Sequence, residues 1–382
     1  MIELGDGEGL LLYGDTERNS DLFYATRFHA PDPFFFLCTQ HSRRLLISDL
    51  EYDRARAQAD VDEVLSQRQY SEAAAAEFGE LAPQQRRFAS VAVMLRELEL
   101  KVVHVAEDFP VGAADFLRSR GFDLKLVPPP ALPQRALKTA TEIEHIHAAL
   151  KASEAAMDVA VEAIRTAGID GDGQLVFEGE VLTAERLRFL IHRTLLELDY
   201  TAQHTIVACG EQGCDPHEQG HGPLRERLPI IIDIFPRSAS SGYFGDITRT
   251  VVKGPATEGL RRQYDAVLEA QLEALAAVRA GADGRRIHEA VTELFTKKGF
   301  DTGEKEGRLQ GFFHGTGHGL GLDIHEDPSI SGRGEILETG HVVTVEPGLY
   351  YLDEGGVRIE DVVVVKEKGC TNLTTYPKFL EV

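Results

Sequence analysis

Long hydrophobic runs are missing from this sequence, which has no stretch of 18 or more apolar residues of the kind that a membrane-spanning helix requires. Its opening segment, residues 1–6, is acidic and lacks the basic and apolar parts of a secretory signal. Cysteine is scarce as well, because the chain contains only four, and their spacing fits neither a disulfide framework nor a zinc finger. We therefore expect a cytoplasmic protein with free thiols that does not enter a membrane.

Positive charge is also in short supply. The 382 residues include 40 Lys and Arg against 62 Asp and Glu, so the formal net charge is −22. A surface that binds nucleic acid needs a basic stripe, and the composition therefore argues against such a partner. The surplus of carboxylates is instead compatible with a protein that binds a cation.

A chain of this length usually folds as two domains. Residues 128–133, Pro-Pro-Pro-Ala-Leu-Pro, can form neither a helix nor a central strand and mark a boundary. Residues 1–133 are predicted to form a small α/β domain, with a hairpin over 34–48 and helical patterns over 51–79 and 84–98.

Residues 134–382 are predicted to form an α+β domain, in which helices lie beside antiparallel strands. Hydrophobic periodicity and glycine stops predict helices at 141–166, 183–198, 257–280 and 285–298. Apolar runs predict strands at 205–209, 229–235, 248–252, 341–346 and 357–365.

A glycine-rich stretch over 311–326 carries three histidines, His314, His318 and His325. So many glycines exclude a helix, since each costs about 1 kcal/mol relative to alanine there. An extended or turning backbone would let the imidazoles approach a ligand closely. Histidine binds metals and carries protons, but the stretch by itself could equally be a polar turn. Its interpretation depends on acidic partners elsewhere in the chain.

Four carboxylates are candidate partners. Asp233 ends an apolar strand and Asp246 opens the next, so a hairpin-like connection would bring them side by side. Glu346 follows another apolar strand and precedes a Pro-Gly pair. Glu360 lies in the apolar run 357–365, where it could bind a metal or simply pair with Arg358. With a glycine-flanked histidine, this oxygen-rich set suits two divalent ions better than a thiolate site does.

The motifs are similar to those of the pita-bread metallopeptidases, and within them to the Xaa-Pro branch, prolidase (Xaa-Pro dipeptidase) and aminopeptidase P. The resemblance covers about 138–382 and rests on five segments: Asp233, Asp-Ile-Thr-Arg-Thr from 246, His-Gly-Thr-Gly-His-Gly-Leu-Gly-Leu-Asp-Ile-His-Glu from 314, Val-Thr-Val-Glu-Pro-Gly-Leu-Tyr from 343, and Arg-Ile-Glu-Asp from 358. It implies a pita-bread catalytic domain, residues 134–382, behind a creatinase-like α/β domain, residues 1–133.

The resemblance also implies two divalent ions, with manganese expected and cobalt or zinc as alternatives. Their ligands would be Asp233, Asp246, His318, Glu346 and Glu360. Asp246 and Glu360 would bridge the ions. His217 would bind substrate, His325 would steady the substrate carbonyl, and Arg358 would lie near the prolyl side. His314 is left as structural, and His221 could equally be an exposed loop residue.

The implied activity is that of an Xaa-Pro dipeptidase, a hydrolase in which a metal-bridging hydroxide attacks the bond before proline and Glu346 carries the proton. A homodimer is the family expectation. Aminopeptidase P, acting on longer peptides, is the nearest alternative. A methionine aminopeptidase, a metal-free creatinase-like hydrolase and a non-catalytic binding module fit less well, because Thr-Arg-Thr follows Asp246 and all five ligands are present. Two departures concern substrate preference: Ile-Phe-Pro follows Asp233, and His204 stands where the family has Asn.

Overall fold

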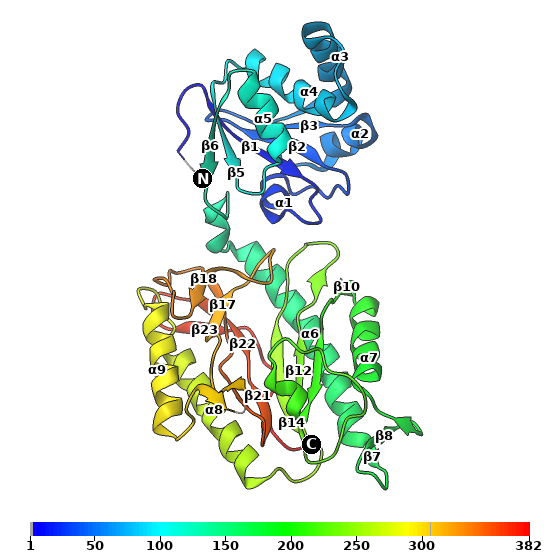
Figure 1. Ribbon diagram of the computed structural model, residues 1–382, viewed down its shortest axis with the longest axis vertical. Coiled ribbons are helices and arrows are strands. Elements are labelled where there is room, and N and C mark those ends of the chain that lie inside the picture. The colour runs from blue at the N-terminus through cyan, green and yellow to red at the C-terminus, as the bar shows by residue number, and fades with distance from the viewer. Residues whose placement is uncertain (1–2, 306) are drawn as a thin grey trace. The chain divides into compact units, whose positions relative to one another are not determined.

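The computed structural model describes residues 3–305 and 307–382. The chain divides into two compact units, Met1–Arg135 and Ala136–Val382 (Figure 1). The division lies close to the proline-rich stretch 128–133. Among the helices that the structure describes, none has both the length and the apolar character needed to cross a bilayer.

The first unit is built on a mixed sheet with the strand order β4-β3-β2-β1-β5-β6. Its strands are β1 (Glu8–Gly14), β2 (Phe34–Cys38), β3 (Arg43–Ile47), β4 (Glu63–Ser66), β5 (Val102–Ala106) and β6 (Asp123–Val127). Its helices are α1 (Ser20–Thr26), α2 (Asp49–Gln58), α3 (Gln67–Phe78), α4 (Pro83–Glu97) and α5 (Val111–Ser119). The antiparallel pairing of β2 with β3 confirms the hairpin predicted over 34–48.

The prediction of one helical pattern over 51–79 was wrong. The strand β4 separates α2 from α3, and it pairs in parallel with β3, so that Val64 lies opposite Leu45 and Leu65 opposite Leu46. Pairing with a distant strand has overridden the local helical preference, as tertiary contacts commonly do.

The second unit contains the helices predicted from periodicity. They are α6 (Ala140–Thr166), α7 (Ala184–Glu197), α8 (Glu258–Ala277) and α9 (Gly284–Lys297). The start of α6 is defined by a capping box, in which the Thr139 side chain accepts from the backbone of Glu142 and the Glu142 side chain accepts from the backbone of Thr139. Two short 3-10 helices, η1 (Pro133–Ala136) and η2 (Gly210–Cys214), complete the helical elements of the described chain.

The two main sheets of the second unit are antiparallel. One has the order β11-β12-β14, with β11 (Ile206–Cys209), β12 (Pro229–Ile234) and β14 (Ile247–Val252). The other has the order β18-β17-β19-β22-β23, with β17 (Gly317–Gly319), β18 (Glu326–Ile330), β19 (Val342–Val345), β22 (Asp361–Val365) and β23 (Cys370–Asn372). Smaller pairs are the hairpin β20 (Gly348–Tyr351) with β21 (Gly355–Arg358), β10 (Tyr200–Thr201) with β13 (Arg237–Ser238), β15 (Gly303–Lys305) with β16 (Arg308–Gln310), and the ribbon β7 (Gly168–Ile169), β8 (Leu175–Phe177) and β9 (Glu180–Val181).

The single strand predicted over 357–365 is broken. β21 ends at Arg358 because it pairs with β20, whereas β22 starts at Asp361 and pairs with β19. Between them, the backbone N–H of Glu360 donates to Thr248 O at 3.1 Å rather than to a strand of either ladder. The break places Glu360 between the sheet that contains β14 and the sheet that contains β22.

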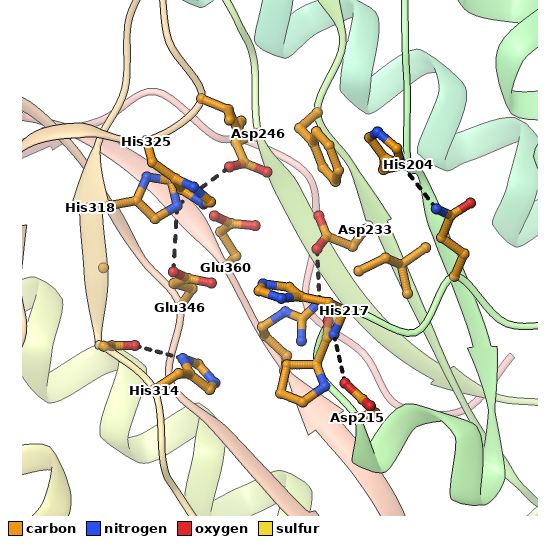
Figure 2. Close-up of a pocket in the computed structure, with 18 of the residues that line it drawn as sticks. His204, Asp215, His217, Asp233, Asp246, His314, His318, His325, Glu346 and Glu360 are labelled. Atoms are coloured by element: carbon orange, nitrogen blue, oxygen red, sulfur yellow. Dashed lines mark hydrogen bonds and ion pairs between the residues drawn. The ribbon is translucent and has the colours of Figure 1, made fainter. Parts of the chain in front are cut away.

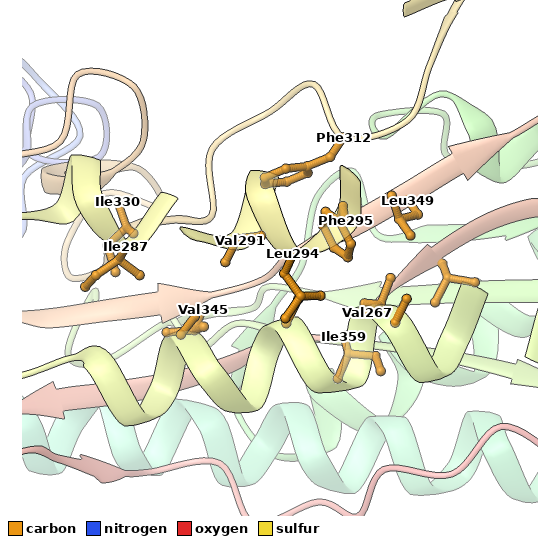
Figure 3. Packing of buried hydrophobic residues seen from close by; sticks show 14 of the residues in the cluster. Val267, Ile287, Val291, Leu294, Phe295, Phe312, Ile330, Val345, Leu349 and Ile359 are labelled. Carbon is orange, nitrogen blue, oxygen red and sulfur yellow. The ribbon is translucent and has the colours of Figure 1, made fainter. Parts of the chain in front are cut away.

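The helices cover these sheets in pairs. α6 and α7 share a buried cluster with β12 and β14, and α8 and α9 share another with β19, β21 and β22 (Figure 1). In α9 the buried residues Ile287, Val291, Leu294 and Phe295 recur at helical spacing and form one apolar face (Figure 3). Each such side chain contributes about 1.5–3 kcal/mol when fully buried, and this packing holds the sheet that carries His318 and Glu346.

Candidate metal centre

Two aspartates reach the centre from the neighbouring strands β12 and β14. In the β12–β14 register, Asp233 lies opposite Thr248 and Ile234 opposite Ile247, and Asp246 directly precedes β14. Side chains alternate along a strand, so Asp246 and Thr248 point to the same face, which is also the face of Asp233. Both aspartates are buried, with 9% and 4% of their surface exposed. The side-by-side placement expected from the sequence is therefore observed.

His318 lies on β17 between two glycines that the packing requires. A Cβ atom on Gly317 would overlap the carbonyl oxygen of Thr344, and one on Gly319 would overlap that of Asp327. The pairing of β17 with β18 also shifts register between these glycines, and such irregularities often redirect a side chain beside a functional site. Nδ1–H of His318 donates to Gly319 O at 3.1 Å, which leaves Nε2 directed at the carboxylates.

Two glutamates complete the group (Figure 2). Glu346 directly follows β19, and its backbone N–H donates to Thr316 O at 2.7 Å. Its Oε1 lies 3.5 Å from Nε2 of His318, and that nitrogen lies 3.8 Å from Oδ2 of Asp246. Glu360 accepts a hydrogen bond from the hydroxyl of Thr248 through Oε2, at 2.8 Å.

Three of the five predicted ligands have donor atoms close enough together to hold one cation. Ligand atoms of Asp246, His318 and Glu360 all lie within 4.8 Å of one another. Asp233 Oδ1 and Glu360 Oε1 are buried, and within the described residues they have no hydrogen-bond partner. Buried carboxylate oxygens without a partner are costly unless a cation or a proton compensates them. Carboxylates with one imidazole suit hard or borderline divalent ions, so the residues fit the metal that the sequence predicts.

The electrostatics of the group point the same way. Burial, followed by the charges of Glu360, Asp233 and Glu346, raises the pKa of Asp246 well above its ordinary value. Burial and the neighbouring Glu346 and Asp233 likewise raise the pKa of Glu360. Burial raises the pKa of Glu346 to about 8, against the opposing effect of Arg358. Burial and then His325 lower the pKa of His318 to about 3, so its imidazole is neutral and able to bind a metal.

Arg358 pairs with Asp233. Nη2 donates to Asp233 Oδ2 at 2.8 Å, Nη1 donates to the Tyr350 hydroxyl at 3.0 Å, and Nε donates to the Thr248 hydroxyl at 3.3 Å. The alternative in which Arg358 simply neutralises Glu360 is wrong, because the break between β21 and β22 turns the guanidinium towards β12. Arg358 bonds Oδ2 of Asp233, and the other oxygen, Oδ1, is the buried one without a hydrogen-bond partner among the described residues.

A cavity of about 730 Å³ opens in front of these groups. It brings together all eight of the site residues predicted from the sequence: His217, Asp233, Asp246, His318, His325, Glu346, Arg358 and Glu360. The rings of His318 and His325 meet edge to face with centroids 4.4 Å apart. The backbone N–H of His217 donates to Asp215 Oδ1 at 3.4 Å.

The other two histidines considered from the sequence have different places. His314 lines the cavity, but both ring nitrogens are engaged: Nδ1–H donates to Gly315 O at 2.7 Å, and Nε2 accepts from the Tyr350 hydroxyl at 2.8 Å. His221 is exposed in a loop, where its carbonyl accepts from Gln212.

Sequence reasoning missed two residues that support the side chains of the cavity and one residue of its wall. Tyr350 bonds both His314 and Arg358, and the hydroxyl of Thr248 bonds Glu360. Both residues lie inside the motifs that were recognised, so the motif itself was the available signal. Gln219 gave no signal, yet its side-chain amide lies 3.0 Å from Nδ1 of His204 on the cavity wall.

Comparison with known proteins agrees with a metal-binding site in this cavity. Residues 144–367 match the model of metallopeptidase family M24. An Xaa-Pro dipeptidase from Pyrococcus furiosus is 35% identical over 242 residues, but that alignment spans only 63% of either chain. An Xaa-Pro dipeptidase from Pyrococcus horikoshii is 27% identical over 94% of this chain and 91% of its own length. The crystal structure of an X-Pro aminopeptidase from Thermotoga maritima superposes with a TM-score of 0.80 at 25% identity, covering 98% of this chain and 97% of that one. The predicted fold, a pita-bread domain preceded by a smaller α/β domain, is confirmed.

Proposed function

Because the chain belongs to metallopeptidase family M24, we propose that it is a dinuclear-metal Xaa-Pro dipeptidase that cleaves the bond before proline. The observation that carries the proposal is the convergence of four carboxylates and one neutral imidazole at the cavity, with two buried carboxylate oxygens left without a partner among the described residues. Buried carboxylates that lie close together are costly unless cations compensate their charge, so this donor set indicates a cation site.

Five side chains would hold the two ions: Asp233, Asp246, His318, Glu346 and Glu360. Asp246 and Glu360, which are 4% and 1% exposed, would be shared between the ions, and manganese is the expected metal with cobalt or zinc as alternatives. When bound, such ions lower the pKa of water from 15.7 to about 7 and polarise the scissile carbonyl.

We assign proton transfer to Glu346. Its side chain is 17% exposed and lines the cavity, so it reaches both the ligand cluster and the space for substrate. We assign it to accept the proton of the attacking water and to deliver it to the departing nitrogen. This delivery is essential, because the prolyl nitrogen must be protonated to leave as a neutral amine.

His325 and His217 would bind the oxygen of the carbonyl under attack. Both line the cavity, and burial, followed by the charge of His217, lowers the pKa of His325, so that the ring is neutral and offers one N–H. Arg358 lines the same cavity on the side assigned to proline. Its hydrogen bond to Asp233 Oδ2 fixes that carboxylate and leaves Oδ1, which has no partner among the described residues, available to a cation.

The assignment of Glu346 is tested with Glu346→Gln, which keeps the size of the side chain but cannot take up a proton. We expect hydrolysis of Ala-Pro to fall by about 10²–10⁴-fold, the usual contribution of a positioned acid or base. Metal content must be measured on the same samples by elemental analysis. Full activity with both metals bound would refute the assignment.

Aminopeptidase P activity is the second candidate, because the cavity of about 730 Å³ has room for more than a dipeptide. Rates for Ala-Pro and Ala-Pro-Ala should be compared on one preparation. A dipeptidase prefers Ala-Pro, whereas a clear preference for the tripeptide would establish the second candidate. If neither peptide is cleaved with manganese, cobalt or zinc present, the chain is a binding module rather than a peptidase.

The assembly is also part of the proposal. We propose a homodimer on the basis of the family resemblance, and light scattering of the purified protein tests it. A single species at the mass of one chain, 42.1 kDa, would reject the dimer.

A further inference from the structure

Arg249 is a buried arginine that the proposed reaction does not use. It lies on β14 between Thr248, which bonds Glu360, and Thr250, whose hydroxyl donates to the carbonyl of Arg358 at 2.9 Å. Because side chains alternate along a strand, Arg249 points away from the face that carries these two threonines. Its side chain is 2% exposed. A cation this deeply buried is tolerated only when its hydrogen bonds are satisfied.

Every N–H group of Arg249 has an acceptor. A guanidinium offers five donors, and here four reach backbone carbonyls and one reaches a carboxylate. The acceptors are Pro377 O for Nε at 3.1 Å, Thr248 O and Glu360 O for Nη1 at 2.9 and 2.5 Å, and Tyr376 O and Asp361 Oδ1 for Nη2 at 2.7 and 3.0 Å. One side chain therefore joins β14, the break between β21 and β22, and the end of the chain.

Glu360 therefore makes three hydrogen bonds with two consecutive residues of β14. Its N–H donates to Thr248 O, its Oε2 accepts from the Thr248 hydroxyl, and its carbonyl accepts from Arg249. The remaining carboxylate oxygen, Oε1, is buried without a partner in the described part of the chain, and Glu360 belongs to the candidate metal-binding group. Within residues 3–305 and 307–382, no ladder hydrogen bond fixes Glu360, so Thr248 and Arg249 decide where that oxygen lies.

The last residues of the chain complete the arrangement. We call residues 376–382 the C-terminal strap, because their backbone lies across Arg249. Lys378 of the strap donates to Asp361 Oδ2 at 2.6 Å and to Gln271 Oε1 at 2.9 Å. Asp361 is the carboxylate that balances Arg249, and Asn372 also donates to it, at 2.7 Å. The position of Arg249 thus depends on the strap.

We propose that Arg249 is a positioning residue for the metal ligand Glu360, and that the C-terminal strap, by completing the hydrogen bonds of Arg249, sets the affinity of the site for divalent cations. The inference rests on the proposed function in one respect, namely that the ligand group binds metal. Partners that orient metal ligands commonly change affinity by 10–100-fold when they are removed, without touching the metal themselves.

The test compares two variants with a matched control. Arg249→Lys keeps the charge but supplies only three donors from one nitrogen, so it cannot reach all the carbonyls. Lys378→Met removes the ion pair between the strap and Asp361 without mutating Arg249. The control is Glu381→Gln, which weakens another anchor of the same strap, the pair of Glu381 with Arg261 at 2.5 Å, and touches none of the residues that hold Glu360.

The readout is the dissociation constant for Mn²⁺, measured by equilibrium dialysis with elemental analysis, together with the Tm of each metal-free protein. We expect affinity to fall by about 10–100-fold in Arg249→Lys, to fall less in Lys378→Met, and to stay unchanged in Glu381→Gln. A role confined to folding would lower Tm and leave the dissociation constant alone.

Three results would overturn the inference. They are a folded Arg249→Lys that binds Mn²⁺ as the parent does, a control that loses as much affinity as the two variants, and, should Arg249→Lys fail to fold, an unchanged affinity in Lys378→Met. If the parent protein binds no Mn²⁺, Co²⁺ or Zn²⁺, the proposed function itself fails and the inference fails with it. That outcome is distinct from a parent that binds metal and variants that bind it equally well.

Discussion

Removing the metal should destabilise the second unit by an amount that can be estimated in advance. A ligand present at 100 times its dissociation constant stabilises the folded state by about 2.7 kcal/mol. In a protein of 150–250 residues, 1 kcal/mol shifts Tm by about 2–4 °C, and the unit Ala136–Val382 is of that size. Chelation should therefore lower Tm by about 5–11 °C. The structural cause is the set of buried carboxylates that repel one another when no cation lies between them.

This loss should depend on pH in a defined direction. Burial raises the pKa of Glu346 from 4.5 to about 8, and the pKa values of Asp246 and Glu360 are raised as well. Above the ordinary pKa of about 4.5, these carboxyl groups bind more protons in the metal-free folded state than in the unfolded state, so their contribution to stability falls as the pH rises towards 8. Protons also compete with metal for the same oxygens. The drop in Tm on chelation is therefore expected to be larger at pH 8.5 than at pH 5.5.

The assay is differential scanning calorimetry of the full chain with saturating Mn²⁺ and with excess chelator at both pH values. Glu360→Gln serves as the control, because it removes one of the proposed metal ligands and should abolish the metal-dependent part of the shift. The reasoning would be refuted by a chelator effect that is equal at the two pH values, or larger at pH 5.5. It would also be refuted if Glu360→Gln kept the full shift.

Two further predictions concern the support of the centre. Gly317→Ala should lower the affinity for Mn²⁺ by at least about tenfold, because the new methyl group would overlap the carbonyl of Thr344 and displace His318. Equilibrium dialysis measures this affinity. Gly332→Ala is the matched control, because the structure shows open space at Gly332. Phe295→Ala should lower the free energy of unfolding by about 3–5 kcal/mol, because Phe295 is 1% exposed in the core that also contains residues of β19. Urea unfolding measures this free energy. A loss below about 1 kcal/mol would contradict the packing described for α9.

Local patterns were sufficient for much of the second unit. The helices α6 to α9 were predictable because their buried positions recur at helical spacing and because glycines and capping residues mark their ends. The aspartates of β12 and β14 were predictable as neighbours because two apolar strands with a turn between them pair antiparallel. The glycines around His318 predicted an extended or turning backbone, and the structure shows that Gly317 and Gly319 also leave no room for a Cβ atom.

Other features could not be predicted locally, because they depend on residues far away in the chain. The pattern over 51–79 reads as a helix, and only the partner strand β3 converts its middle into β4. The run 357–365 reads as one strand, and only the competing partners β20 and β19 divide it. That division decides that Arg358 faces Asp233 rather than Glu360.

The sequence by itself determined which side chains could bind a cation, since their chemical types and their glycine and strand settings are local properties. Only the tertiary structure decided which oxygens of those side chains are free to do so. Arg249 shows the reason: within the recognised segment Asp-Ile-Thr-Arg-Thr it is one polar residue among several, and its acceptors at Glu360, Tyr376 and Pro377 lie more than a hundred residues further along the chain. Contacts at that separation are set by how the whole unit packs, which no local pattern contains.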